Sequence, residues 1–153
     1  MTKYVIIMCG GAGKTKIYEK YPNLFLDIDH FIWNQNNKTY REQLMTYVEK
    51  GDIKNISKLY KNIMKLDSEL RNDNRIILTH HPDNAKDLNR EILDIIRPIE
   101  DLHLINIQKR EKAHQQFSIN DFHELTKYKP YEYKTYKQLE ERLLQCVDMT
   151  NAI

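Results

Sequence analysis

Cysteine, proline and glycine are scarce in this chain of 153 residues, and long apolar runs are missing. Its two cysteines, Cys9 and Cys146, stand far apart, and neither belongs to a CxxC pair or to a Cys/His pair with zinc spacing. Such sparse cysteine usage favours a reduced intracellular protein. The longest uninterrupted apolar stretch, residues 5–9, is too short to span a bilayer, and the N-terminus shows no signal-peptide pattern. We therefore expect a cytoplasmic protein with no membrane partner.

The chain also lacks an excess of either charge, since 24 basic residues stand against 22 acidic ones and the formal net charge is +2. A balanced surface gives no general signal for a polyanionic partner, so any nucleic-acid binding would have to be local. The length is most simply that of one domain over residues 1–153, which buries roughly two thirds of its unfolded surface. None of these features indicates an oligomeric state.

Three of the four glycines cluster near the N-terminus. They follow a short, β-rich apolar run and lead directly into a Lys-Thr pair and a helix-compatible stretch, which is the pattern of a P-loop. Glycines let backbone N–H groups wrap a phosphate, the lysine reaches the β- and γ-phosphates, and the threonine hydroxyl holds Mg²⁺ at a helix N-terminus. The sequence therefore predicts a site for ATP and Mg²⁺, and its nucleotide-binding residues are Gly10, Gly11, Ala12, Gly13, Lys14 and Thr15.

The motif departs from the usual Walker A pattern at one position. That pattern places a glycine five residues before the Gly-Lys pair, and this chain has Met8 there. A dinucleotide-binding fingerprint fits less well, because its third glycine is replaced by Lys16. The remaining alternative is a glycine-rich turn between a strand and a helix that binds nothing, and the Lys-Thr pair in register argues against it.

Segments of β type alternate with helical segments along the chain. We expect strands at residues 3–9, 24–28, 75–79, 102–107 and 131–135. We expect helices at residues 14–21, 43–49, 53–64 and 109–116, a helix opened by Pro82 with Ala85, Leu88, Ile92 and Ile95 or Ile96 on its buried face, and a closing helix buried through Leu139, Leu143 and Val147. Strands separated by helices pair in parallel through right-handed crossovers. The fold class is therefore α/β, a three-layer sandwich with a mostly parallel sheet and a helical insert at about residues 34–71.

Two carboxylates separated by one residue, Asp27 and Asp29, end the second predicted strand. In an extended strand this spacing puts both side chains on one face. Ligands of parallel α/β sheets bind at the carboxyl ends of the strands, where these carboxylates would meet a γ-phosphate. We assign Asp29 as the catalytic base for an acceptor hydroxyl, and Asp27, with Thr15, as the metal-side residue. The alternative is that one aspartate caps the following helix and the other is solvated.

The order of these motifs is similar to that of a known family. A strand, a glycine-rich loop ending in Gly-Lys-Thr, a helix and a strand ending in Asp-x-Asp resembles the small-molecule and polynucleotide kinase branch of the P-loop NTPase fold, which includes shikimate, gluconate and phage polynucleotide kinases. Within that branch the chain most resembles short phage-encoded P-loop kinases, through Leu26-Asp27-Ile28-Asp29 and the turn Thr79-His80-His81-Pro82. The resemblance spans residues 3–112, although the third predicted strand does not end in an aspartate. It implies ATP and Mg²⁺ as cosubstrates, an acceptor near Asp29 and, for a phage-encoded protein, the host cytoplasm.

Kinases of this branch cover the bound phosphates with a basic lid helix, and the basic run at residues 109–112 stands where such a lid is expected. We assign Arg110 as the catalytic cation that stabilises charge on the transferred phosphoryl group, with Lys109 as a weaker candidate. The alternative is a solvated helix face. His80 and His81 are candidates for a hydrogen bond to the acceptor or to a phosphate, and no third ligand is spaced for zinc. Arg41, in the predicted insert, is a weaker candidate for contact with an acceptor phosphate.

The segment at residues 127–137 interleaves tyrosines with lysines, a composition that can stack bases and follow a phosphate backbone. It is also typical of a short, partly exposed edge strand, in which lysines discourage pairing with another sheet. The balanced net charge favours the edge strand, but a nucleic-acid substrate stays open.

Together the motifs predict an ATP-dependent phosphotransferase that moves the γ-phosphate to a nucleoside, a nucleotide or a similar small acceptor. Its catalytic residues are Asp29, Lys14 and Arg110. A polynucleotide or modified-base DNA kinase is the alternative enzyme. A nucleotide-binding or slow NTPase module without a small-molecule acceptor is the alternative of a different class.

Overall fold

A single five-stranded sheet organises the protein, and the computed structural model describes residues 2–34, 38–110 and 112–151. The strands lie in the order β2-β3-β1-β4-β5, and every neighbouring pair is parallel. In chain order the elements are β1 (Tyr4–Met8), α1 (Lys14–Lys20), β2 (Phe25–Asp27), α2 (Ile28–Asn34), α3 (Lys38–Glu49), α4 (Ile53–Leu66), α5 (Ser68–Asn72), β3 (Ile76–Thr79), α6 (Asp83–Leu88), β4 (Glu91–Pro98), α7 (Glu100–Ile107), α8 (Lys112–Glu124), the 3₁₀ helix η1 (Leu125–Tyr128), β5 (Tyr131–Tyr133) and α9 (Tyr136–Asn151).

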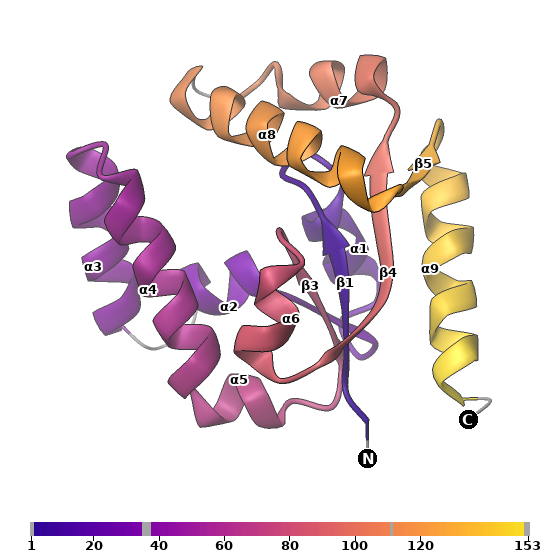
Figure 1. Cartoon of the computed structure of the whole chain (residues 1–153), viewed down its shortest axis with the longest axis horizontal. Helices are drawn as coiled ribbons and strands as arrows, with labels where there is room; N and C mark the ends of the chain where they lie inside the picture. The colour runs from indigo at the N-terminus through magenta and orange to yellow at the C-terminus, as the bar shows by residue number, and fades with distance from the viewer. Residues whose placement is uncertain (1, 35–37, 111, 152–153) are drawn as a thin grey trace.

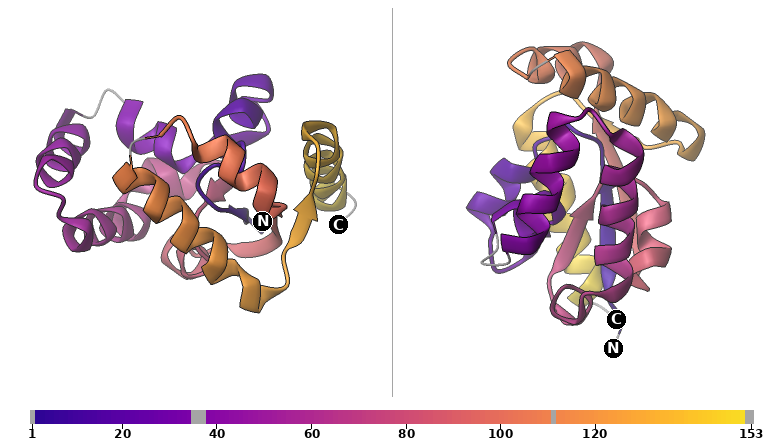
Figure 2. Two further views of the ribbon diagram at one scale, coloured as in Figure 1. Left: turned by 90° about the horizontal axis from the view of Figure 1, so that it is seen from above. Right: turned by 90° about the vertical axis from the view of Figure 1, so that its left-hand side faces the viewer.

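Helices cover both faces of the sheet, so the protein has three layers. α6 lies on one face, and α1 and α9 lie on the other, where an ion pair between Lys20 and Glu140 joins them (Figures 1 and 2). Helices α2 to α5 follow β2 and form a helical insert beside that edge of the sheet (Figure 1). The predicted α/β three-layer sandwich with a parallel sheet and a helical insert is confirmed.

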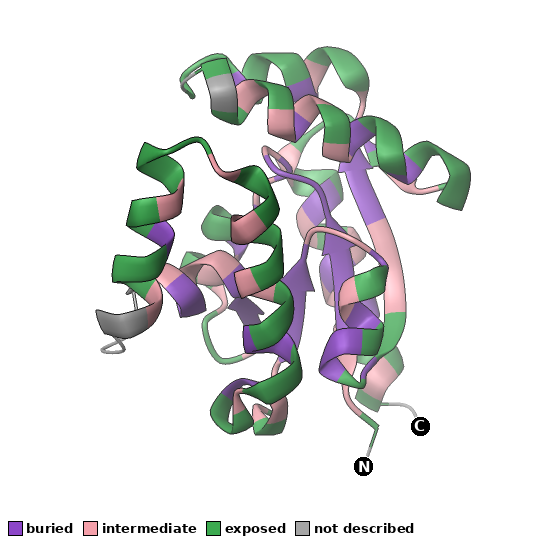
Figure 3. Ribbon diagram, turned by 60° about the vertical axis from the view of Figure 1, so that its left-hand side comes forward, coloured by how far each residue is buried: buried purple, intermediate pink, exposed green. Residues whose placement is uncertain are grey.

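The core is centred on β1, whose residues from Val5 to Met8 are fully buried, as is Cys9 after it. A parallel strand covered by helices on both faces is apolar at successive positions instead of alternating, which explains the continuous run Val-Ile-Ile-Met-Cys. Figure 3 shows the buried residues concentrated in the central strands, with the exposed ones on the outer faces of the helices. Among the described residues, no helix is both long enough and apolar enough to cross a membrane.

The prediction of a helix through Ile92 and Ile96 is wrong, because these residues belong to β4. The preceding helix α6 ends at Leu88, and Asn89 adopts a left-handed conformation with φ 54° that terminates it. β4 then pairs with β1 on one side and β5 on the other. The spacing of its isoleucines suits one face of a helix, but a strand with apolar residues on both faces produces the same spacing. In β4 only the last three residues, 96–98, are buried.

The prediction of a strand at residues 102–107 is also wrong, because this segment is helix α7. Glu100 and Asp101 occupy its first turn, where negative charge favours the helix N-terminus. His103 and Ile107, four residues apart, are buried, whereas Leu104 and Ile105 between them are exposed. This is the period of a helix that buries one face.

The other predicted segments agree with the structure in position, with shifted bounds. The helix predicted at residues 43–49 begins earlier, at Lys38, and the basic helix predicted at residues 109–116 is α8, which begins at Lys112; residue 111 lies outside the described residues. Asp52 caps α4, since its side chain accepts a hydrogen bond from the Asn55 N–H at 3.2 Å. β5 is the predicted edge strand, and α9 is buried through Leu139, Leu143 and Cys146, with Val147 packed against the core.

Candidate active site

The glycine-rich loop connects the buried end of β1 to the start of α1 at Lys14. Gly11 and Gly13 have φ angles of +83° and +93°, which side chains rarely adopt. A Cβ atom on Gly11 would lie 2.6 Å from Ile107 Cγ2, so this position is closed to other residues by both conformation and space. Met8, where the Walker A pattern has glycine, is the last residue of β1 and is fully buried. The strand therefore continues through this position, and the turn begins only after it.

Three side chains outside the loop hold its carbonyl groups. His103 Nε2 lies 2.7 Å from the Gly10 oxygen, Asn106 Nδ2 donates to the Gly11 oxygen at 3.0 Å, and the Tyr133 hydroxyl donates to the Ala12 oxygen at 2.7 Å. A carbonyl can only accept, so Nε2 of His103 carries the proton. Burial lowers the pKa of His103 and raises that of Tyr133, which keeps the histidine neutral and the phenol protonated. With its carbonyls bound from outside, the loop is fixed in shape.

Sequence reasoning missed His103, Asn106 and Tyr133. His103 and Asn106 stand three residues apart on α7, so both can reach the loop from one helix, but this spacing carries no signal in a segment predicted as a strand. The sequence predicts an edge strand around Tyr133, and no neighbouring residue in the sequence indicates that its hydroxyl reaches the P-loop. These contacts depend on the tertiary placement of α7 and β5.

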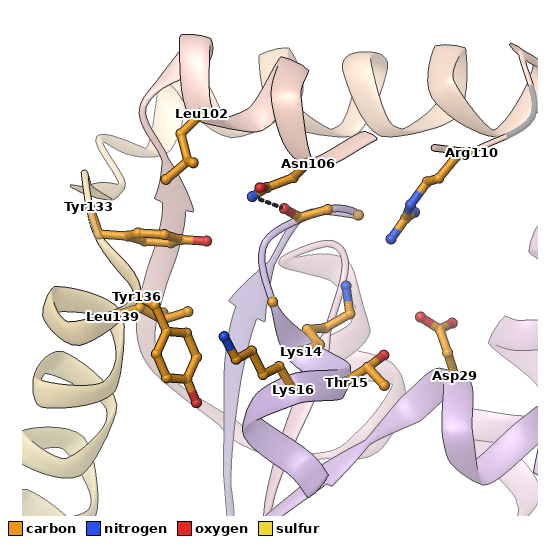
Figure 4. Close-up of a pocket in the computed structure, with 13 residues that line it drawn as sticks. Lys14, Thr15, Lys16, Asp29, Leu102, Asn106, Arg110, Tyr133, Tyr136 and Leu139 are labelled. Carbon is orange, nitrogen blue, oxygen red and sulfur yellow. Dashed lines mark hydrogen bonds between the residues drawn. The ribbon is translucent and has the colours of Figure 1, made fainter. Parts of the chain in front are cut away.

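Lys14 is buried beside the loop and faces the ends of β1 and β3. Its Nζ lies 3.2 Å from the carbonyl oxygens of Met8 and Cys9 and 3.3 Å from Nδ1 of His80. These three contacts match the three N–H groups of its ammonium. Figure 4 shows Lys14, Asp29 and Arg110 pointing toward the same space beside the loop.

Asp27 and Thr15 lie side by side where β2 ends and α1 begins. The Thr15 hydroxyl donates to Oδ2 of Asp27 at 3.3 Å, and Oδ1 of Asp27 accepts the Asp29 N–H at 3.1 Å. Asp27 therefore does cap the following helix, because Asp29 already belongs to the first turn of α2 and not to the strand. Burial, followed by the charge of Asp29, raises the pKa of Asp27. A buried carboxylate beside a hydroxyl is a set of hard oxygen donors that fits Mg²⁺.

Asp29 is the centre of a hydrogen-bond network. Its Oδ1 accepts from the Tyr60 hydroxyl at 2.8 Å and lies 2.9 Å from Nε2 of His80, and the Trp33 indole N–H donates to the Tyr60 oxygen at 3.1 Å. Because the ammonium of Lys14 can only donate and a carboxylate can only accept, His80 takes a proton on Nε2 and accepts from Lys14 at Nδ1. Burial opposes ionisation of Asp29, but His80 and Lys14 outweigh it and lower its pKa. Asp29 is thus a carboxylate whose Oδ2 accepts no hydrogen bond from the described residues.

The remaining sequence candidates are spread more widely. Arg110 lies between α7 and α8, is exposed, and donates from Nη1 to the Ser118 hydroxyl at 3.2 Å. His81 Nδ1 accepts from the Asp83 N–H at 3.1 Å, so its Nε2 donates to Glu124 at 3.2 Å. Lys109 and Arg41 are exposed and line neither of the two cavities described next.

Two cavities meet at this site. The P-loop cavity, of about 390 Å³, is lined by Gly10, Gly11, Gly13, Lys14, Thr15, Lys16, Asp29, Leu102, Asn106, Arg110, Tyr133, Tyr136 and Leu139 (Figure 4). The insert cavity, of about 570 Å³, lies between the helical insert, the end of β3 and α8. Gly10, Asp29 and Arg110 line both cavities. The structure thus brings the predicted loop, carboxylate and arginine to one junction.

The same fold occurs in a solved kinase. The crystal structure of shikimate kinase from Bacteroides thetaiotaomicron, at 1.7 Å resolution, matches with a TM-score of 0.61 over 98% of this chain and 98% of that chain, at 15% sequence identity. No protein-family model matches the chain, and no curated protein matches it. The parallel sheet with a glycine-rich loop after its central strand therefore has the same fold as that kinase.

Proposed function

We propose that this protein is an ATP-dependent phosphotransferase that moves the γ-phosphate of ATP to a nucleoside, a nucleotide or a similar small hydroxyl or phosphate acceptor. The observation that carries the proposal is the junction of the two cavities at Gly10, Asp29 and Arg110. ATP in the P-loop cavity and an acceptor in the insert cavity would meet between a cation and a carboxylate. Phosphoryl transfer depends mainly on such positioning and charge stabilisation.

The P-loop cavity has the groups that a nucleoside triphosphate requires. The N–H groups of the loop and the ammonium of Lys14 would bind the phosphates, with Lys14 exchanging its contacts to Met8 and Cys9 for phosphate oxygens. At the far end of this cavity, Leu102, Tyr136 and Leu139 provide apolar surface for a base. Mg²⁺ would be held by Thr15 and Asp27, and it would neutralise charge on the phosphate oxygens when bound.

On the acceptor side, Asp29 would receive the hydroxyl group. Tyr60 and His80 both bind its Oδ1 and fix the carboxylate in place, which leaves Oδ2 to accept a hydrogen bond from the acceptor. Its lowered pKa keeps it ionised, so we assign it the orientation of the hydroxyl and the late uptake of its proton. Arg110 would stabilise the charge that develops on the transferred group.

The proposal is tested by the transfer of labelled γ-phosphate from ATP to a panel of nucleosides, nucleotides and 5′-hydroxyl oligonucleotides. We expect Asp29→Asn to lower transfer by about 10²- to 10³-fold and to leave the ATP dissociation constant within about twofold, because the loop and Lys14, which would bind the phosphates, are left in place. Asp148→Asn, the same substitution at an exposed position on α9, serves as the matched control.

Two results would replace the proposal with an alternative. Labelling of oligonucleotides alone would identify a polynucleotide or modified-base DNA kinase. ATP binding with no labelled acceptor at all would identify a nucleotide-binding or NTPase module. Circular dichroism and thermal unfolding of Asp29→Asn show whether a loss of transfer reflects a loss of fold.

A further inference from the structure

The insert cavity carries more negative than positive charge. Its charged lining residues are Asp29, Asp83, Asp87, Asp121, Lys61 and Arg110. In the proposed function Arg110 faces the transferred phosphoryl group, because it also lines the P-loop cavity. Within the described part of the chain, Lys61 on α4 is then the one permanent cation of this cavity left for an acceptor. Asp87 is paired with Lys65 at 3.9 Å, so an anionic acceptor would be bound against repulsion from the remaining carboxylates, Asp29, Asp83 and Asp121.

Asp121 on α8 is an unused hydrogen-bond acceptor in this cavity. It is half-buried, and its carboxylate takes no hydrogen bond from any residue that the structure describes. It lies within electrostatic reach of His80 and Lys14, and so near the Asp29 network. Asp121, like Oδ2 of Asp29, can accept an N–H or O–H group from a ligand but can donate nothing while ionised. A ligand that satisfies both carboxylates must carry several donors.

Flat rings form much of the remaining wall. Trp33 on α2, Tyr60 on α4 and Phe117 on α8 all line the cavity, so aromatic surface comes both from the insert and from the helix that crosses the ends of the strands (Figure 1). The hydrogen bond from Trp33 to Tyr60 fixes the first two relative to each other. Aromatic walls with a few placed polar groups are typical of sites for ring-shaped ligands.

We infer that the acceptor is an uncharged, ring-bearing alcohol with several hydrogen-bond donors, of the nucleoside class, and that nucleoside monophosphates and other anions are excluded. This inference rests on the proposed function and narrows its range of acceptors, because the junction at Asp29 by itself accommodates both an uncharged and an anionic acceptor. Three features favour the uncharged acceptor: the excess of carboxylates over free cations, the unused oxygens of Asp29 and Asp121, and the aromatic wall.

The cavity has its own reporter, because Trp33 is the only tryptophan of the chain and lines it. Fluorescence excited at the tryptophan edge can follow binding of thymidine, uridine, cytidine and adenosine, each paired with its 5′- and 3′-monophosphates. We expect at least one nucleoside to bind at least about tenfold more tightly than both of its monophosphates. Equal or tighter binding of the monophosphates, or no binding of any nucleoside, would overturn the inference.

Substitution of Asp121 tests whether its carboxylate causes the discrimination between nucleosides and their monophosphates. With the best nucleoside of the panel, Asp121→Asn should raise the dissociation constant about tenfold and lower that of the matching monophosphates, so that discrimination shrinks. Asp148→Asn should change neither. ATP binding and the unfolding temperature show whether Asp121→Asn remains folded. Loss of nucleoside binding without improved monophosphate binding would contradict the electrostatic explanation.

The readouts separate this inference from the proposed function. Binding reported by Trp33 needs no catalysis, so selective binding of a nucleoside without transfer would uphold the inference while the phosphotransferase proposal fails. Transfer to nucleotides or oligonucleotides in preference to nucleosides would uphold the phosphotransferase and overturn the inference.

Discussion

The two cavities that meet at Gly10 and Asp29 are built in opposite ways. Most polar groups of the P-loop cavity come from one continuous segment, residues 10–16, and from the backbone as much as from side chains. The insert cavity is assembled from α2, α3, α4, the end of β3, α6 and α8, and it depends on side chains. A site made from one turn can be recognised in a sequence, whereas a pocket assembled from many separate elements cannot.

The charges of the residues that line the two cavities also differ. Lys14, Lys16 and Arg110 line the P-loop cavity against the single carboxylate of Asp29, whereas carboxylates outnumber permanent cations in the insert cavity. The lining of the P-loop cavity therefore favours negative charge, whereas that of the insert cavity disfavours it. Substitutions on each side should therefore have separable effects.

Lys14→Ala should have the largest effect, because it removes the buried cation from the P-loop cavity. We expect γ-phosphate transfer to fall about 10³-fold and ATP affinity to fall with it. Nucleoside binding followed by Trp33 fluorescence should weaken far less than ATP binding, because Lys14 does not line the insert cavity and touches its wall only through His80. Lys137→Ala, at an exposed position on α9, is the control. A comparable loss of nucleoside binding would show that the two cavities are not independent.

Arg110→Ala should come next, because Arg110 lines both cavities. Transfer should fall about 10²-fold at saturating substrates, while the affinities for ATP and for the acceptor each change by less than about threefold. Arg41→Ala, on α3, removes an exposed arginine that lines neither cavity and should leave transfer unchanged. Steady-state kinetics with both substrates varied distinguishes the outcomes, and an unchanged maximal rate in Arg110→Ala would remove it from the catalytic residues.

Alanine substitutions at two glycines with positive φ distinguish the cost of backbone strain alone from the cost of strain plus a steric contact. At Gly51, with φ +64°, a Cβ atom meets nothing within 4 Å, so Gly51→Ala should cost about 1 kcal/mol of unfolding free energy. Gly11→Ala adds a contact of 2.6 Å with Ile107, and should cost about 2–3 kcal/mol. Denaturant unfolding measures both values, and ATP affinity should fall only for Gly11→Ala. Equal losses of unfolding free energy would mean that α7 shifts to make room for the added methyl group.

Asp121→Asn should have the smallest effect on the fold, and in the stabilising direction. Burial raises the pKa of Asp121 above its ordinary value of 3.8, so at neutral pH the folded state bears a cost for the charge that the unfolded chain does not. The variant should therefore unfold about 2 °C higher than the parent at pH 8. The difference should shrink as the pH falls through the raised pKa and vanish only well below pH 3.8, where Asp121 is protonated in both the folded and the unfolded state. A difference in unfolding temperature that instead grows toward low pH would mean that the fold does not raise the pKa of Asp121.

The sheet and the P-loop could be predicted because their signals are local. An apolar run, three glycines and Lys-Thr define a strand, a turn and a helix within residues 4–20. Residues 91–98 and 102–107 were assigned to the wrong type, since a short apolar segment with β-branched residues suits either a buried strand or one face of a helix. Strand pairing with β1 and packing of α7 against the loop decide between them, and both are tertiary.

The site could be predicted only in part for the same reason. The motifs indicate Lys14, Thr15, Asp27 and Asp29, because each stands at the end of a strand or the start of a helix beside the loop. They do not indicate Tyr60 or Asp121, which lie 31 residues and 92 residues beyond Asp29 in the sequence and reach the site only through the placement of α4 and α8. A spacing rule cannot link groups that are brought together by helix packing.

The hydrogen bonds that His103, Asn106 and Tyr133 make to the P-loop carbonyls have a thermodynamic consequence. Since these bonds join the loop to side chains of the folded protein itself, the loss of backbone entropy belongs to folding and not to association. Nucleotide affinity and global stability therefore draw on the same contacts. A destabilising change in α7 or β5, far from any phosphate, should weaken both together.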